Sequence, residues 1–205
     1  MAINTYAALQ NAIVRWARKT GDMEFSDTVP DFIRLCEADI NRTMRMREME
    51  ATTTLTPSSN EVTLPTNYIE WRLVTANTTP PGVMTPTTRG LVAQTYSDST
   101  SPNPRFFYIY SNKLVVTPAF TGTVKLDYYA EIAALTTSAT TNFMLTDYPD
   151  VYLFGSLVQA GAYLGDDPRI TLWREEFAKA KGEASARDRV SQFGRRAAVG
   201  GPAPE

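Results

Sequence analysis

The sequence predicts an α+β fold in which two helical segments flank a segment rich in strands. Threonine marks the middle of the chain, because 22 of the 27 threonines lie between residues 51 and 146. The same segment holds 8 of the 13 prolines and only 10 of the 42 charged side chains, a composition typical of strands and turns. The flanking residues 1–50 and 147–190 carry most of the charge and show helical periodicity. We therefore expect helices, then strands, then helices.

Two helices are expected in the first flank. Apolar side chains recur at helical spacing behind an N-cap at Asn4 or Thr5, and Gly21 ends this first helix. Its apolar positions are Tyr6, Leu9, Ile13 and Trp16. The second helix is predicted to begin near Thr28, which can cap it, and to end near Met49. Its apolar stripe consists of Phe32, Leu35, Cys36, Ile40 and Met44.

Alternation and turn residues predict the strands of the middle segment. One hairpin is expected from 52–56 and 61–64 around a four-residue turn, and a second from 105–110 and 113–117 around Ser111 and Asn112. In 123–129, Val124, Leu126 and Tyr128 alternate with polar positions, as in a half-buried strand. A short helix is expected to start at Thr85–Pro86, and 136–142 form a polar linker.

Two further helices are expected in the last flank. Asp147 is the predicted N-cap of the first, with Pro149 in its first turn and Gly165 at its end. Small residues make this helix thin, so that a neighbouring helix can approach closely: Gly155, Ser156, Ala160, Gly161 and Ala162. Asp166–Pro168 restart a helix whose apolar stripe is Trp173, Phe177, Ala180 and Ala184.

Packing these elements leads to a specific architecture. Neither helix pair can bury its stripe alone, so we predict a four-helix bundle formed by the N-terminal and C-terminal helix pairs. In domain terms, 1–50 plus 147–190 form a discontinuous helical bundle and 51–146 a β-rich insertion. The remaining residues, 191–205, are rich in glycine, proline and alanine, and we expect a flexible C-terminal tail.

The composition excludes several classes of chemistry. The chain has no histidine and one cysteine, Cys36, so no His-based triad or internal disulfide is possible. Cys36 lies on an apolar helical stripe and is interpreted as a core residue. No nucleotide-binding glycine motif or acidic metal-binding loop is present, and we expect neither a cofactor nor a metal. The longest uncharged stretch, Val151–Gly165, is 15 residues, too short to span a bilayer, and no export signal is apparent.

Charged clusters are the remaining candidate sites. The pairs Asp166/Asp167 and Glu175/Glu176 are interpreted mainly as helix-capping and first-turn acids. Arg42, Arg45 and Arg47 follow the second helix and either offset its dipole or contact DNA or a partner. The net charge of −2 gives no general attraction to nucleic acid.

Three stretches of the sequence resemble the phage head-to-tail adaptor, or connector, family, including tail tubular protein A-like proteins. They are Leu64–Val74, Phe106–Leu135 and Asn142–Ala180, and the resemblance extends over residues 1–186. Its most specific part is the run NFMLTDYPDVYLFG leading into YLGDDPRITLW. The matching positions are Asn142, Phe143, Leu145, Thr146, Pro149, Asp150, Tyr152, Leu153, Gly155, Tyr163, Leu164, Asp166, Asp167, Arg169 and Trp173.

The resemblance implies a structural virion protein in the neck or tail, assembled in the host cytoplasm. It implies that copies of the chain form a dodecameric ring, which joins the portal protein to a tail or nozzle protein and continues the DNA channel. It also implies that the protein has no enzyme activity of its own. Within this reading we expect the tail to bind the portal through Phe193, Arg195, Arg196 and Val199. Two alternatives remain: a peptidoglycan-degrading virion protein that uses carboxylates such as Asp150 and Glu175, and a free-standing binding module with a β-rich face.

Overall fold

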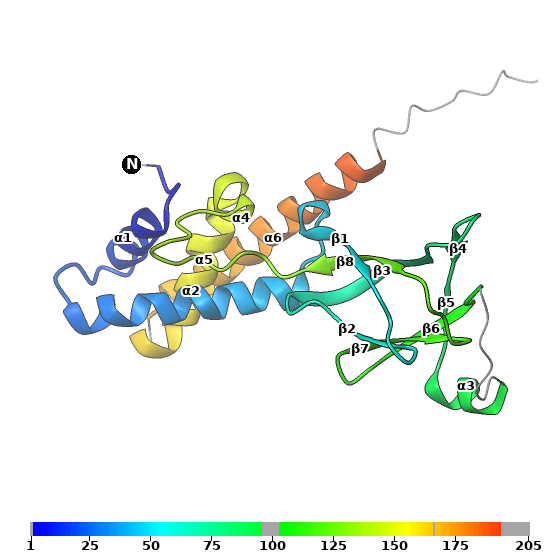
Figure 1. Cartoon of the computed structure of the whole chain (residues 1–205). Coiled ribbons are helices and arrows are strands. Elements are labelled where there is room, and N and C mark those ends of the chain that lie inside the picture. Colours follow the sequence, from blue (N-terminus) through cyan, green and yellow to red (C-terminus); the bar gives the residue numbers. More distant parts are fainter. Residues whose placement is uncertain (1, 96–102, 166, 194–205) are drawn as a thin grey trace, which may run out of the picture. The chain divides into compact units, whose positions relative to one another are not determined.

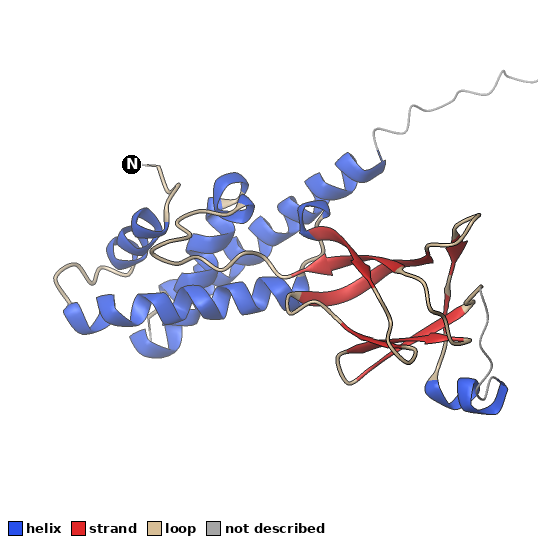
Figure 2. Cartoon of the chain, in the orientation of Figure 1, coloured by secondary structure: helices blue, strands red, loops and turns tan. Residues whose placement is uncertain are grey.

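The structure is a computed structural model that describes residues 2–95, 103–165 and 167–193. These residues form six α-helices and two four-stranded sheets, and the order of helices, strands and helices along the chain is as predicted (Figures 1 and 2). The chain divides into two compact units. One comprises Met1–Glu48 with Ile132–Glu205, and the other Met49–Glu131. The first contains five of the helices and the second contains both sheets.

The first two helices begin at side-chain N-caps. Helix α1 (Tyr6–Trp16) starts as predicted, where the Thr5 hydroxyl accepts the Ala8 N–H at 3.2 Å. Helix α2 (Met23–Thr43) starts five residues before the predicted Thr28, because Asp22 caps it by accepting the Phe25 N–H at 3.0 Å. Pro30 therefore lies inside α2.

Helix α2 also ends earlier than Met49. Its last residue is Thr43, and the extended Met44 follows as the C-cap. A short 3-10 turn, η1 (Arg47–Met49), comes next. The exposed fraction of Leu35, predicted to be buried, is 50%. The face of α2 that packs inward consists instead of Phe25, Val29, Phe32, Ile33, Cys36, Glu37 and Ile40.

The predicted four-helix bundle of two terminal pairs is wrong. Helix α5 (Pro149–Leu164) is buried on nearly every side rather than along one stripe. It packs against α1, α2, α6 (Arg169–Phe193) and the extra short helix α4 (Phe143–Asp147). In Figure 1, α5 is the yellow helix among these neighbours. An all-round apolar helix needs neighbours on every side, so the helices surround α5 instead of forming two equivalent pairs.

Helix α4 also changes the predicted start of α5. Asp147 is the last residue of α4, so it does not cap α5, whose N-cap is Tyr148 without a side-chain hydrogen bond. Asn142 caps α4 by accepting the Leu145 N–H at 2.8 Å. The predicted first-turn Pro149 and terminal Gly165 of α5 are confirmed.

The thin surface of α5 brings α2 and α6 close, as predicted. A Cβ atom on Gly155 would overlap Cys36 Sγ and lie 2.7 Å from Phe177 Cε2. The predicted apolar stripe of α6 is buried throughout: Trp173, Phe177, Ala180 and Ala184. Helix α6 continues to Phe193, so Ser191–Phe193 are helical, and 194–205 lie outside the described residues.

The second unit contains two sheets from the middle of the chain. One sheet has the order β1-β8-β3-β4, from β1 (Glu50–Leu55), β8 (Val124–Ala130), β3 (Tyr68–Ala76) and β4 (Gly82–Val83). The other has the order β2-β7-β6-β5, from β2 (Glu61–Thr63), β7 (Lys113–Thr117), β6 (Phe106–Tyr110) and β5 (Thr85–Pro86). All pairings are antiparallel except β5 with β6.

The sequence predicted one hairpin correctly and one incorrectly. Strands β6 and β7 form the expected hairpin, with Ser111 and Asn112 at φ values of 47° and 59°, as a two-residue type I′ turn requires. Strands β1 and β2 exist but do not pair, because β1 pairs with β8 and β2 with β7. The short helix is α3 (Arg89–Thr95), which starts after β5 rather than at Pro86.

The two sheets share one apolar core. Val124, Leu126 and Tyr128 of β8 point into it, which confirms the predicted alternation. From the other sheet, Phe107 and Leu114 are 1% and 0% exposed. Side chains from both sheets thus cover each other, as in a small β-sandwich.

Candidate interaction surfaces

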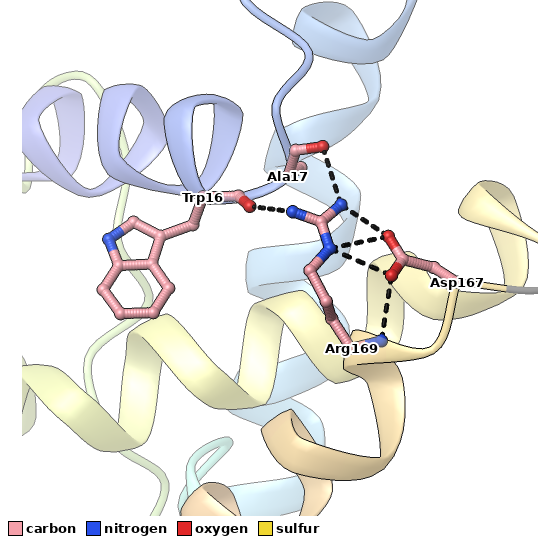
Figure 3. A network of polar contacts seen from close by, with 4 residues as sticks. All are labelled: Trp16, Ala17, Asp167 and Arg169. Atoms are coloured by element: carbon pink, nitrogen blue, oxygen red, sulfur yellow. Dashed lines mark hydrogen bonds and ion pairs between the residues drawn. The ribbon is translucent and has the colours of Figure 1, made fainter.

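Arg169 joins the start of α6 to the end of α1. Its guanidinium donates hydrogen bonds to the Trp16 carbonyl at 2.8 Å and the Ala17 carbonyl at 3.2 Å (Figure 3). The Asp167 carboxylate accepts from Arg169 Nε at 2.9 Å and from the Arg169 backbone N–H at 2.9 Å. Carbonyl oxygens at the end of a helix lack intrahelical donors, so Arg169 satisfies them and fixes the position of α1.

These contacts hold the pKa of Asp167 low. Hydrogen bonds from the Arg169 side chain and then from its backbone N–H favour the carboxylate and lower the pKa to about 2. A group whose folded pKa lies below the ordinary value of 3.8 stabilises the fold above that value. That stability is lost as the pH falls from about 3.8 towards about 2.

We predict that Asp167→Asn lowers the melting temperature at neutral pH. The amide lacks the charge that pairs with Arg169, so the variant also loses the part of the wild-type acid dependence between pH 3.8 and about 2. Thermal melts over a pH series measure both effects. Asp147→Asn is the control, since Asp147 is exposed and forms no ion pair with any described residue. Identical melting profiles for the two variants would contradict the role of Asp167.

A groove opens beside this contact. We call it the arginine groove; its volume is about 530 Å³, and it is lined by Arg15, Trp16, Arg18, Arg169, Leu172 and Trp173. The exposed fractions of Trp16 and Leu172 are 49% and 54%, while Trp173 is 2% exposed. The Trp16 ring stands edge-on to the Phe154 ring at 5.6 Å between centroids. The groove therefore offers an apolar floor that water reaches.

The arginine groove is also cationic. Arg15 and Arg18 are exposed, and neither forms an ion pair with a carboxylate in the part of the chain that the structure describes. Arg15 Nε donates to the Asn11 carbonyl, at 3.3 Å. Exposed apolar and cationic side chains in one concave surface are typical of a protein contact.

A second hollow lies in the sheet unit, with a volume of about 430 Å³. Here the charges balance: Arg72 pairs with Glu50, and Lys125 lies 3.5 Å from Asp127. The Thr52 hydroxyl donates to the Asp127 carboxylate at 2.5 Å. Because its charges are paired internally, this hollow shows no preference for a ligand of either sign.

A buried carboxylate ties the segment before α4 to the helices. The Glu37 side chain is 5% exposed and accepts the Leu135 N–H at 2.8 Å and the Tyr152 hydroxyl at 3.1 Å. Burial raises the pKa of Glu37, against the opposing effect of these two hydrogen bonds. We assign this residue a structural role, because it satisfies two buried donors.

The three predicted arginines after α2 lie in different environments. Arg45 donates to the carbonyls of Asn41 and Met44 at 2.8 and 2.7 Å, which is the helix-capping interpretation. Arg47 pairs with Glu48 at 3.0 Å, and the Arg42 side chain is 72% exposed. The neighbouring Met44 and Met46 are buried and offer no surface to a partner. Contact of these arginines with DNA or a partner stays a prediction.

The predicted carboxylate chemistry finds no supporting geometry. Asp150 and Glu175 are both exposed, whereas a general acid at neutral pH needs a buried, apolar site. Among the described residues, no group of three or more His, Cys, Asp or Glu side chains is arranged to hold a metal. Cys36 is fully buried as predicted, and burial raises the pKa of its thiol.

The predicted tail residues are only partly described. Phe193 is the last residue of α6, and Arg195, Arg196 and Val199 lie outside the described residues.

No described helix has the length and hydropathy needed to cross a membrane.

Sequence reasoning missed the arginine groove. Trp16 was predicted to belong to the apolar stripe of α1, and no role was predicted for Arg15 or Arg18. The groove could not be predicted because side chains from α1 and α6 meet only in the folded unit. The available signal was Arg169 and Trp173, which belong to the most specific part of the family pattern.

The arginine groove combines exposed apolar and cationic side chains in one concave surface, as sites of protein contact do. A comparison with family models agrees: the SU10 adaptor protein family matches residues 4–200. The chain therefore belongs to this family of structural phage adaptor proteins, which confirms the resemblance of the sequence to phage adaptors. A comparison with curated proteins found no match.

Proposed function

We propose that this chain is a virion protein of the phage neck that joins the portal ring to the tail. In this role, copies of the chain form a dodecameric ring, which continues the DNA channel and assembles in the host cytoplasm. The observation that carries the proposal is the family match, because it spans residues 4–200 of a 205-residue chain. An adaptor function therefore concerns the whole chain and not one module of it.

The surface chemistry supports this proposal. Four large apolar side chains of the helical unit are about half exposed or more: Trp16, Met23, Leu35 and Leu172. A protein that contacts neighbours on several sides needs exposed apolar surface of this kind. The net charge of −2 also gives no general adhesion to DNA that passes through a channel.

Mixing the purified chain with portal rings of the phage that encodes it tests the proposal. Alone at micromolar concentration, we expect mostly monomer, because each lateral contact is weak until a template aligns many of them. With portal rings, native mass spectrometry should show one ring of added copies. If no copies of the chain bind to portal rings, the proposed portal function is wrong. If the chain forms a stable dodecamer without the portal, assembly does not require the portal as a template.

Deleting residues 194–205 is the second arm of this experiment. We propose that these residues, with Phe193 of α6, contact the portal, as the charges of Arg195 and Arg196 allow. The truncated chain should keep its melting temperature, because Val199 is the one large apolar side chain in the sequence of 194–205, but it should attach to portal rings much more weakly. Unchanged attachment would show that this segment does not bind the portal.

A peptidoglycan zymogram tests the alternative function, and we expect no clearing by the full chain.

A further inference from the structure

The exposed face of α2 carries a line of acidic side chains. Residues Glu24, Asp27, Asp31 and Leu35 follow one another at intervals of three and four, so they share one side of the helix. All four are exposed, and the opposite side of α2 is buried. We call this face the acidic stripe; at about 1.5 Å per residue it is roughly 16 Å long.

The two aspartates of the acidic stripe are not neutralised by a described cation. Asp27 and Asp31 form no ion pair with any Lys or Arg in residues 2–95, 103–165 and 167–193. Arg34, which is exposed one turn after Asp31, is a basic residue at the edge of the stripe. Leu35 adds a half-exposed apolar side chain at its end. The arginine groove has the converse character: Arg15 and Arg18, which form no ion pair with a described carboxylate, lie around the exposed Trp16 and Leu172.

We infer that the acidic stripe of one copy docks into the arginine groove of a second copy. The inference rests on the proposed ring, and it assigns the two faces of the lateral contact. Each face has what the other lacks: a convex acidic helix with an apolar end, and a concave cationic site with an apolar floor. Helices commonly bind partners by laying one face in a groove. Because the two faces differ, the contact is head-to-tail, and repeating it generates a ring or an open helix of copies.

Charge dominates this contact, so it should be weak and sensitive to salt. Ion pairs between exposed side chains contribute only about 0–1 kcal/mol each. Screening shortens their range to a few Å at about 1 M salt. A single contact therefore produces dimers and short chains only at high protein concentration and low ionic strength, which agrees with a mainly monomeric chain at micromolar concentration.

Sedimentation velocity of the full chain tests the inference directly. At high micromolar concentration in low salt, the wild type should associate, and added NaCl should reverse the association. Arg15→Glu/Arg18→Glu and Asp27→Arg/Asp31→Arg should each weaken association about ten-fold or more, because like charges then face each other. An equimolar mixture of the two variants should associate again, since each variant now offers the complement of the other.

Matched controls separate this contact from net charge and from misfolding. Arg174→Glu/Arg189→Glu and Glu175→Arg/Glu183→Arg match the two double variants in net charge, change exposed residues of α6 outside both faces, and should associate like the wild type. Arg15→Lys/Arg18→Lys keeps the charge and should also associate, and melting curves verify folding. A wild type that stays monomeric under these conditions, or a mixture that fails to associate, overturns the inference.

The portal-binding experiment and the sedimentation experiment test separate hypotheses, so either hypothesis can be wrong while the other holds. If the wild type covers portal rings and the charge-reversed variants cover them equally well, the lateral contact lies elsewhere and the proposed function stands. If the wild type ignores portal rings but shows salt-sensitive association that the mixture restores, the contact stands and the portal function fails. If the arginine groove instead binds an acidic segment of another protein, the pure chain should stay monomeric in the sedimentation experiment.

Discussion

Replacing Glu37 by alanine is expected to lower the free energy of unfolding of the helical unit by about 1–3 kcal/mol for the orphaned Leu135 N–H alone. The carboxylate accepts that N–H at 2.8 Å in a site that water barely reaches. The Tyr152 hydroxyl loses an acceptor at the same time, and the truncated side chain leaves a cavity. Urea denaturation of both proteins measures the total loss.

The pH dependence of stability distinguishes charge from hydrogen bonding at this site. Burial raises the pKa of Glu37 above its ordinary value of 4.5, so the folded state retains a proton that the unfolded state releases. The stability associated with this proton is fully present below pH 4.5 and is lost as the pH rises through the raised pKa. Glu37→Gln keeps an acceptor oxygen and cannot ionise, so this decline should disappear.

An exposed glutamate provides the control for these variants. Glu183→Ala changes a solvent-facing side chain of α6 and should alter the unfolding free energy by no more than about 0.5 kcal/mol. If Glu37→Ala proves as mild as Glu183→Ala, the carboxylate is not a necessary acceptor in the folded unit.

Local signals predicted those elements that depend on neighbouring residues. Thr5 caps α1 through a residue three positions away, and Ser111 and Asn112 fit a turn that joins adjacent strands. The alternation in β8 reports a sheet with one buried face. In each case the deciding interaction lies within a few residues along the chain.

Long-range contacts decided the elements that were predicted incorrectly. Strand β1 reaches past β2 to pair with β8, about 70 residues further along, and no local pattern records that choice. Thr28 was predicted to cap α2, but the Asp22 cap and burial of Phe25 extend the helix in front of it. The bundle failed for the same reason, since burial of α5 on all sides depends on four neighbours.

Arg169 is both a residue of the family pattern and a contact that positions α1. The sequence showed that Arg169 and Trp173 belong to the family pattern, but not that Arg169 fastens α1 by its terminal carbonyls. The Arg169 guanidinium also lies over the Trp173 ring, 5.0 Å from its centroid. One side chain thus orders the end of α1, which carries Trp16 and Arg18 of the arginine groove.

Replacing Gly155 by alanine is expected to destabilise the helical unit, although alanine is the better helix former by about 1 kcal/mol. The new Cβ would overlap Cys36 Sγ and approach Phe177 Cε2 to 2.7 Å. Both side chains are buried, at 0% and 7% exposure, so neither can move into solvent. Overpacking of this kind costs about 1–3 kcal/mol, which exceeds the gain in helix propensity over most of that range. Thermal or urea unfolding measures the net effect.

Two further variants show whether the close approach of helices is the cause. Gly182→Ala places a Cβ in α6 where no atom lies within 4 Å, so it should raise stability by up to about 1 kcal/mol through helix propensity. Cys36→Ala removes the sulfur atom that the Cβ of residue 155 would meet. In a double-mutant cycle, Gly155→Ala should therefore be less destabilising on the Cys36→Ala background than on the wild type. Equal effects on both backgrounds would show that the contact between α5 and α2 does not require a glycine.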